Sequence, residues 1–145
     1  MTICELNAEE LDEAMKLVWH VFLQFEAPEY SAEGVAEFHQ SIHNPEFLAT
    51  LRTYGAIQDG RLIGVLATRS DGGHIALFFV DGACQRQGTG RALFERACQD
   101  NPFDTITVNS SPYAVPIYHR LGFTDTDVEQ VTNGLRYTPM ICQIR

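Results

Sequence analysis

The chain has 145 residues, 45% of them apolar and 20% charged, which is the size and composition of one globular domain and excludes a disordered segment. Its longest apolar run, Ile75–Val80, is far shorter than the roughly 20 residues of a membrane-spanning helix, so we expect no membrane partner. The first residues show no basic region followed by an apolar stretch, so we expect no signal peptide. Its four cysteines form no Cys-x-x-Cys pair, which favours free thiols and a cytoplasmic location over disulfides or zinc.

The net charge of −9 is distributed unevenly along the chain. Residues 1–60 hold eleven acidic side chains against Lys16 and Arg52, whereas the acids and arginines of residues 61–145 balance. Nucleic acid is therefore an unfavoured partner, because phosphate binding needs a basic face. This uneven charge suggests that the two halves of the chain bind different ligands. An acidic face that only aids solubility is the alternative.

Apolar residues recurring every three or four positions predict two helices in the first third of the chain. The first follows an Asn-x-x-Glu capping box and ends at about Phe25, and the second runs from Ser31 to about Asn44. A short strand, Ile3–Leu6, precedes both helices, and a further helical turn is indicated near Leu48.

The pattern then changes to alternation typical of strands. It predicts strands over Tyr54–Gln58, Arg61–Arg69, His74–Asp81, Thr105–Asn109, Phe123–Val131 and Leu135–Ile144, and helices over Gly88–Asp100 and from about Ser111, as its cap, to Gly122. Asp59-Gly60 and Asn133-Gly134 indicate tight hairpins, because both residues of such turns favour positive φ. The order β-α-α-β-β-β-α-β-α-β-β predicts one α/β domain over residues 1–145.

The segment from Phe78 to Arg91 leads from a strand through a Gly-x-Gly loop into a helix. Free backbone N–H groups and the positive end of a helix dipole make such a loop an anion site. A Walker A loop is excluded because Arg91, not Lys, follows Gly90, and a dinucleotide fingerprint is excluded because Leu93 stands where it needs Gly or Ala. A tight turn without a ligand is the alternative that this segment alone leaves open.

Two blocks of the chain resemble the GNAT superfamily of acyl-CoA-dependent N-acyltransferases. Gln85-x-x-Gly88-x-Gly90 is similar to that family's Q/R-x-x-G-x-G/A loop. Residues 109–123, an Asn-bearing strand end followed by a helix with Tyr and by Leu-Gly-Phe, resemble its second block. With the element order, the resemblance covers essentially the whole chain and implies a single-domain GNAT fold, a mixed and mostly antiparallel sheet flanked by helices. Arg86 departs from the family, in which many members have Gly.

The resemblance also implies ligands and residue roles, with acetyl-CoA as co-substrate and an amine as acceptor. Backbone groups of Phe78 and Val80 would pair with the pantetheine arm, and Asn109 would contact it or hold the strand end. The loop would hold the pyrophosphate through its amides, with Arg91 assisting, and comprises Gln85, Arg86, Gln87, Gly88, Thr89, Gly90 and Arg91. Tyr118 would lie near the sulfur.

A phenol with an ordinary pKa near 10 can protonate a departing thiolate, so Tyr118 is the expected general acid. The alternative is a half-buried tyrosine of purely structural role. Glu26 is the expected general base, because the family arrangement puts it beside the acceptor cleft, and Asp81 is the second candidate. His119 should face elsewhere, because adjacent helix residues diverge by about 100°. The histidines show no metal-ligand spacing, and we expect no metal.

These residues predict an N-acetyltransferase that moves the acetyl group of acetyl-CoA to a primary amine. The acidic N-terminal half favours a small cationic amine as the acceptor. One alternative is a protein acetyltransferase acting on a lysine or an N-terminus, and another is a CoA-binding regulatory domain without turnover. A C-terminal hairpin at a sheet edge is compatible with a homodimer.

Overall fold

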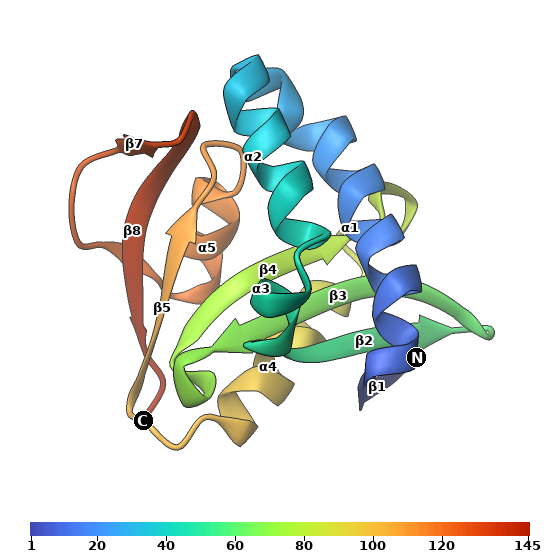
Figure 1. Ribbon diagram of the computed structural model, residues 1–145. Coiled ribbons are helices and arrows are strands. Elements are labelled where there is room, and N and C mark those ends of the chain that lie inside the picture. The colour runs from blue at the N-terminus through green and yellow to red at the C-terminus, as the bar shows by residue number, and fades with distance from the viewer.

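In the computed structural model, which describes residues 1–145, a mixed sheet runs through the molecule (Figure 1). The strand order is β1-β2-β3-β4-β5-β8-β6, and β7 pairs with β8 beside β6. The strands are β1 (Thr2–Glu5), β2 (Arg52–Gln58), β3 (Arg61–Arg69), β4 (His74–Val80), β5 (Thr105–Ser110), β6 (Thr124–Asp125), β7 (Gln130–Thr132) and β8 (Leu135–Gln143). Only β4 and β5 are parallel, so the predicted mixed, mostly antiparallel sheet is confirmed.

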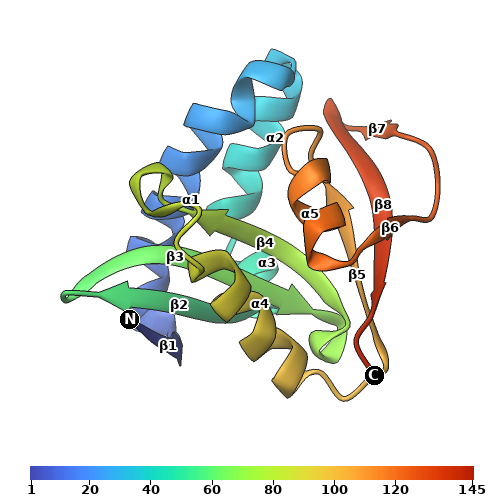
Figure 2. The same cartoon turned by 180° about the vertical axis from the view of Figure 1, so that it is seen from behind.

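Helices cover both faces of the sheet. On one face lie α1 (Leu11–Phe25), α2 (Ala32–Ile42) and the short α3 (Pro45–Ala49), and the view from behind shows α4 (Thr89–Asp100) and α5 (Val115–Leu121) on the other (Figure 2). Each face has its own apolar core. Phe22 of α1 is part of one core, and Leu93 of α4 is part of the other. The capping box is present, since Glu10 N–H donates to Asn7 and Asn7 N–H to Glu10.

Both predicted hairpin turns have the backbone that their sequences favour. Asp59 and Gly60 have φ of 53° and 74°, and Asn133 and Gly134 have φ of 52° and 79°. The predicted strand Phe123–Val131 is wrong as a single strand, because it is split into β6 and β7. Thr126 N–H donates to the carbonyl of Pro139 in β8, but proline has no N–H to return, so the pairing is interrupted there.

The start of α5 also differs from the expectation. Ser111 does not cap this helix: Ala114 is the N-cap, and the Ser111 hydroxyl accepts the Ala114 N–H at 3.3 Å in the preceding turn. Pro116 therefore falls in the first helical turn, where a missing N–H leaves no hydrogen bond unmade. Gly122, at φ 106°, ends the helix in the left-handed conformation that glycine favours.

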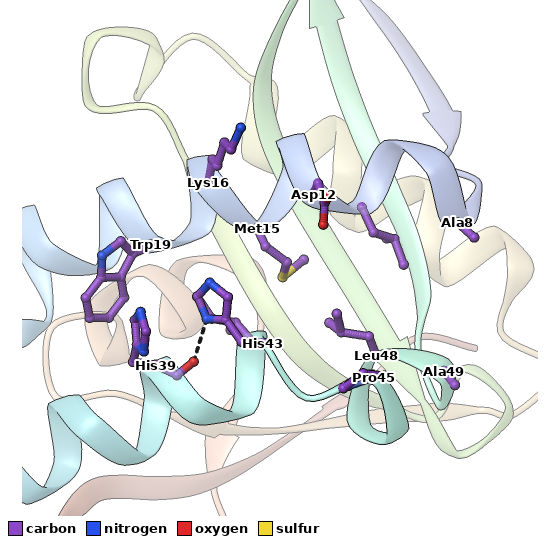
Figure 3. Close-up of a pocket in the computed structure, with 12 residues that line it drawn as sticks. Ala8, Asp12, Met15, Lys16, Trp19, His39, His43, Pro45, Leu48 and Ala49 are labelled. Carbon is purple, nitrogen blue, oxygen red and sulfur yellow. Dashed lines mark hydrogen bonds between the residues drawn. The ribbon is translucent and has the colours of Figure 1, made fainter.

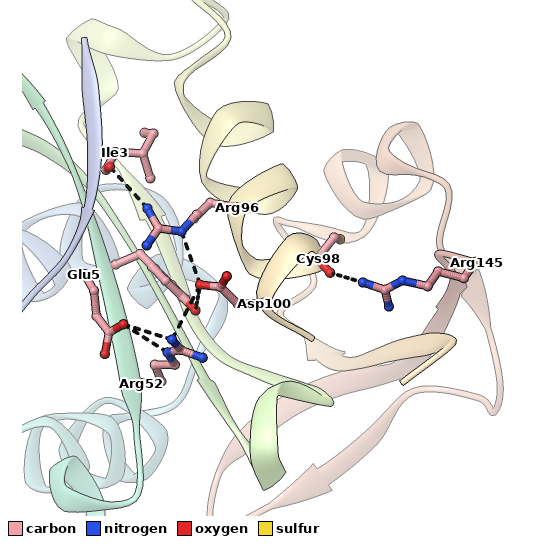
Figure 4. A network of polar contacts seen from close by, with 8 residues as sticks. Ile3, Glu5, Arg52, Arg96, Cys98, Asp100 and Arg145 are labelled. Carbon is pink, nitrogen blue, oxygen red and sulfur yellow. Dashed lines mark hydrogen bonds and ion pairs between the residues drawn. The ribbon is translucent and has the colours of Figure 1, made fainter. Parts of the chain in front are cut away.

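A polar network fixes the far end of α4 against the sheet edge (Figure 4). Asp100 accepts the hydroxyl of Tyr54 at 2.8 Å and pairs with Arg96 at 3.2 Å, and Arg96 also donates to the carbonyl of Ile3 at 3.4 Å. Arg52 joins this network through Asp100 at 3.7 Å and also pairs with Glu5 at 3.1 Å. The anchored C-terminus holds the axis of α4, and thereby the position of the loop that enters it.

The start of α2 touches the hairpin between β7 and β8 through two glycines. A Cβ added to Gly34 would overlap the carbonyl oxygen of Gly134, and a Cβ added to Gly134 would lie 2.5 Å from the nitrogen of Gly34. The main chains of helix and hairpin are thus in direct contact. The hydroxyl of Tyr30 donates to the carbonyl of Arg136 at 3.2 Å, and Arg136 donates to the carbonyl of Glu29 at 3.2 Å.

Candidate functional site

The central feature of the site is an opening in the sheet between β4 and β5. The two strands pair only at His74 with Thr107 and Ile75 with Val108, and then diverge (Figure 2). Asp81 N–H donates to Ile63 of β3 at 2.8 Å. Because the backbone direction alternates along a strand, the N–H groups of Phe78 and Val80 point into the opening. The second half of β4 therefore has an unpaired edge inside the molecule.

The side chain of Gln85 closes part of that edge. Its Nε2 donates to the carbonyl of Val80 at 3.1 Å, and its Oε1 accepts the hydroxyl of Tyr113 at 3.4 Å. Gln85 therefore ties the end of β4 to the loop after β5, which is a role beyond the amide contact expected from the sequence. Phe25, at the end of α1, stacks on Tyr113 at 5.2 Å between ring centres and brings α1 to the same place.

The loop from β4 to α4 presents backbone N–H groups beside the opening. Gly88 is the N-cap of α4 at φ 84°, and no side chain caps the helix. The N–H groups of Thr89, Gly90 and Arg91 in the first turn therefore have no intrahelical partner, and together with the helix dipole they form an anion site. A Cβ on Gly90 would lie 3.5 Å from the ring of Phe78, an ordinary contact, so packing alone does not require glycine there.

Arg86 adopts the left-handed conformation, with φ of 65°. Such a backbone costs a residue with a Cβ about 1 kcal/mol relative to glycine, which explains why a glycine at this position suits the loop. The side chain of Arg86 is exposed and forms no ion pair, and Gln87 beside it is also exposed. Arg86 therefore carries a positive charge on the outer side of the loop.

Asp81, the second candidate base, is engaged in building the loop. Its carboxylate accepts the Ala83 N–H at 2.9 Å and lies 3.8 Å from Arg61. Asn109, at the end of β5, pairs its backbone with Pro139, and its exposed side chain makes no hydrogen bond within the protein. His119 is exposed and contacts Asp125 at 2.8 Å, so it faces away from Tyr118 as expected.

Tyr118 lies on the inner face of α5 with only 5% of its surface exposed. Its ring meets Phe78 of β4 edge-on at 6.0 Å and Phe123 at 5.2 Å. Burial raises the pKa of Tyr118, and the nearby charge of Glu26 raises it further. The phenol therefore keeps its proton at neutral and moderately alkaline pH, and its hydroxyl makes no hydrogen bond within the protein.

Glu26 lies at the C-terminal end of α1, where the chain turns toward Tyr30. Removal of the carboxyl from water raises the pKa of Glu26 to about 7, the charge of Glu29 adds to the increase, and a hydrogen bond from Ser111 opposes it. The fold thus places Glu26 near enough to Tyr118 for its charge to act on the phenol, although 91 positions separate them in the chain. Ser111 and Tyr30 complete the cluster, and the sequence carried no signal for either.

The raised pKa of Glu26 predicts a pH-dependent stability. The folded protein binds this proton more tightly than the unfolded chain, whose ordinary value is 4.5, so the free energy of unfolding should fall as the pH rises from 4.5 to 7. We expect Glu26→Gln to lack this fall and to exceed the wild type at pH 8 by about 1 kcal/mol after solvent screening. Urea denaturation at pH 5 and pH 8 measures both values, and an equal fall in both proteins would contradict the prediction.

A separate cleft of 540 Å³ lies between α1, α2 and α3 and shares no residue with the cluster around Tyr118 (Figure 3). It is lined by apolar side chains such as Met15 and by Trp19, His39 and His43. No group of three or more His, Cys, Asp or Glu side chains is arranged to hold a metal ion. None of the helices is both long enough and apolar enough to span a membrane.

Several solved structures share this fold, and N-acetyltransferases are among them. The chain is similar to a GCN5-related N-acetyltransferase from Rhodopseudomonas palustris, with a TM-score of 0.82, 18% identity, and coverage of 98% of this chain and 94% of that one. The PaiA N-acetyltransferase of Thermoplasma acidophilum in complex with coenzyme A gives a TM-score of 0.75 at 16% identity, with 99% of both chains covered.

A third similar structure is the ribosomal-protein-S18-alanine N-acetyltransferase of Escherichia coli, with a TM-score of 0.64, 22% identity, and coverage of 99% of this chain and 93% of that one. No curated protein sequence matches the chain significantly. Residues 26–144 match the family described as acetyltransferase (GNAT) domain, a span that includes the glycine loop, β4, β5 and α5. The chain therefore belongs to the GNAT family of acetyl-CoA-dependent N-acetyltransferases.

Proposed function

We propose that the protein transfers the acetyl group of acetyl-CoA to the primary amine of a small cationic acceptor, with Glu26 as general base and Tyr118 as general acid. The observation that carries this proposal is that the charge of Glu26 acts on the phenol of Tyr118, whose ring packs against Phe78 of β4. One group can take a proton near pH 7 and the other can give one, which are the two proton transfers that the reaction needs.

Acetyl-CoA would bind along the opening. The backbone of Phe78 and the N–H of Val80 would pair with the pantetheine arm, with Asn109 on the opposite side. The N–H groups at the start of α4 would hold the pyrophosphate. The loop residues assigned to it are Gln85, Arg86, Gln87, Gly88, Thr89, Gly90 and Arg91, with Gln85 acting through its hold on β4. This arrangement directs the thioester toward Tyr118, whose ring touches Phe78.

The chemical step follows from these positions. An ammonium acceptor loses a proton to Glu26, directly or through water, and the neutral amine then attacks the thioester carbonyl carbon. As the C–N bond forms, negative charge gathers on the carbonyl oxygen, where an N–H of the unpaired β4 edge can stabilise it. When the C–S bond breaks, Tyr118 donates its proton to the leaving sulfur, and the extra proton on the attacking nitrogen passes to the resulting phenolate, directly or through water. Glu26 then releases its proton to solvent, and the products are the acetylated amine and free CoA.

The acidic side of the site favours a cationic acceptor. Glu29 follows Glu26 by three residues at the turn between α1 and α2. The whole net charge of −9 lies in residues 1–60, because the charges of residues 61–145 sum to zero. CoA is itself polyanionic, so an acidic acceptor would be repelled by both protein and co-substrate. The fold does not decide the acceptor, since structures similar to this chain include an aminoglycoside 6′-N-acetyltransferase and a ribosomal-protein-alanine N-acetyltransferase.

Glu26→Gln is expected to lower kcat/KM for the amine by about a hundredfold, to raise KM for the amine more than for acetyl-CoA, and to remove the rise of kcat/KM with pH near 7. In the wild type, kcat/KM for the amine should fall as salt rises, because ions screen the attraction over about 10 Å at 0.1 M. Thiol release from acetyl-CoA, measured with a panel of amines and peptides, provides these constants.

Glu46→Gln is the matched control, because Glu46 is exposed on α3 and its loss changes the net charge equally. If the acceptor proves to be neutral or acidic, or if kcat/KM does not change with ionic strength, then the acidic faces serve only to keep the protein soluble. Acetylation of peptides but not of small amines would identify a protein acetyltransferase. Binding of acetyl-CoA with no thiol release from any amine would indicate a regulatory domain.

A further inference from the structure

We propose that Tyr113 is a positioning residue, which holds both the start of the acetyl-CoA loop and the end of α1 at the outer end of the opening between β4 and β5. The inference rests on the proposed function, in which Glu26 at the end of α1 is the base. Tyr113 lies in the turn between β5 and α5 and belongs to neither the glycine loop nor the pair that transfers protons.

The hydroxyl of Tyr113 acts on the β4 side of the opening. It donates to Oε1 of Gln85 at 3.4 Å, and Nε2 of the same amide donates to the carbonyl of Val80 at 3.1 Å. Because one planar amide carries both the oxygen and the nitrogen, a bond to one atom orients the other. The next residue, Arg86, has the left-handed backbone of the loop. Tyr113 therefore helps to fix the point at which the loop leaves β4.

The ring of Tyr113 acts on the α1 side of the opening. It stacks on Phe25, the last residue of α1, with the ring centres 5.2 Å apart and the ring planes inclined by 24°. The Phe25 ring also lies against the main chain of Gly82, where an added Cβ would stand 3.0 Å from Cζ of Phe25. The end of α1 is therefore held between the loop after β4 and the turn after β5, and Glu26 is the next residue.

These contacts close a ring of residues around the outer end of the opening. Its members are joined in the order Val80, Gln85, Tyr113, Phe25 and Gly82. β4 and β5 pair over two residues only, so no ladder sets the distance between their far ends. Tyr113 is the member of the ring that comes from the β5 side. Its two contacts therefore position the loop and α1 relative to the turn after β5.

Two separable effects follow from this one side chain. The amides assigned to the pyrophosphate come directly after Gln85, so the hydroxyl of Tyr113 governs the affinity for acetyl-CoA. The base comes directly after Phe25, so the ring of Tyr113 governs attack by the amine. A displacement of about 1 Å near reacting atoms can cost about a hundredfold in rate, so the hold on the end of α1 has a large effect on turnover.

Tyr113→Phe removes the hydroxyl and keeps the stacked ring. We expect its Kd for acetyl-CoA, measured by calorimetry without amine, to rise about threefold, as for one lost neutral hydrogen bond. At saturating acetyl-CoA, kcat/KM for the fastest amine of the panel should equal that of the wild type. Tyr137→Phe is the matched control, because the Tyr137 hydroxyl also donates to a glutamine oxygen, that of Gln130 at 3.2 Å. Its Kd should stay unchanged.

Phe25→Leu removes the stack from the other side and leaves the Tyr113 hydroxyl in place. We expect kcat/KM for the same amine to fall about tenfold, and the Kd for acetyl-CoA to stay at the wild-type value. Phe47→Leu is the control, since Phe47 is also half-buried but lies on α3, and it should keep both constants. Tyr113→Leu removes ring and hydroxyl together and should show both defects.

A double-mutant cycle tests the path through Gln85. Gln85→Met should weaken acetyl-CoA binding, and adding Tyr113→Phe should cause no further loss, because the hydroxyl acts through the amide. A wild-type Kd in Tyr113→Phe, or additive losses in the cycle, would overturn the role of the hydroxyl. A wild-type kcat/KM in Phe25→Leu would overturn the role of the ring. If Glu26→Gln keeps the wild-type kcat/KM while Tyr113→Phe still weakens acetyl-CoA binding, then the base assignment fails and the hold of Tyr113 on the loop stands.

Discussion

Tyr118→Phe is expected to slow acetyl transfer by about a hundredfold or more, because the variant cannot protonate the departing sulfur. The ring would stay packed between Phe78 and Phe123, and the hydroxyl has no hydrogen bond within the protein to lose. The free energy of unfolding should therefore change by less than about 1 kcal/mol. Thiol release under saturating acetyl-CoA and amine measures the rate, and urea denaturation measures the stability.

Tyr137→Phe is the matched control for that experiment. Tyr137 lies on β8, where its hydroxyl contacts the side chain of Gln130 at 3.2 Å, away from the opening in the sheet. This variant should keep the wild-type rate. A Tyr118→Phe protein that keeps it across pH 6–10 would return Tyr118 to a purely structural role.

Gly90→Val is expected to abolish acetyl-CoA binding that calorimetry can detect, a loss of about a hundredfold or more in affinity. The added Cβ would lie in ordinary contact with the ring of Phe78, and valine is no worse than glycine inside a helix, so the fold should remain. The two methyl groups would occupy the space between the start of α4 and the unpaired edge of β4. Gly88 is a less clean target, because its φ of 84° would strain any side chain.

Ala36→Val serves as the control for Gly90→Val, because it adds the same two methyl groups to an exposed position of a helix on the other face of the sheet. Its affinity for acetyl-CoA should equal that of the wild type. If Gly90→Val also keeps that affinity while it remains folded, then the pyrophosphate does not bind at the start of α4.

Local rules predicted most of the fold from the sequence. The hairpin at Asp59-Gly60 and the end of α5 at Gly122 depend on backbone conformations that a few neighbouring residues determine. The split between β6 and β7 was missed, because it depends on Pro139 in a strand that is remote in sequence but adjacent in the sheet. The start of α5 was misplaced because serine and proline suit several positions of a helix entry equally well.

The candidate site was predictable only where a motif spans it. The glycine loop and Tyr118 lie in segments whose spacing is informative. The cluster of Glu26, Ser111 and Tyr30 forms only because the end of α1 packs against the loop after β5, and that contact leaves no periodic pattern in the chain. The pKa of Glu26 follows from the same packing, since burial is its largest cause.

The contact between Gly34 and Gly134 also has a consequence for motion. Because main-chain atoms of α2 and the β7–β8 hairpin touch directly, no change of side-chain rotamer can let one slide past the other. Helix and hairpin should therefore move as one body on the microsecond to millisecond timescale of collective displacements. Tyr30, bonded to the same hairpin at Arg136, would follow that body and carry the turn next to Glu26 with it.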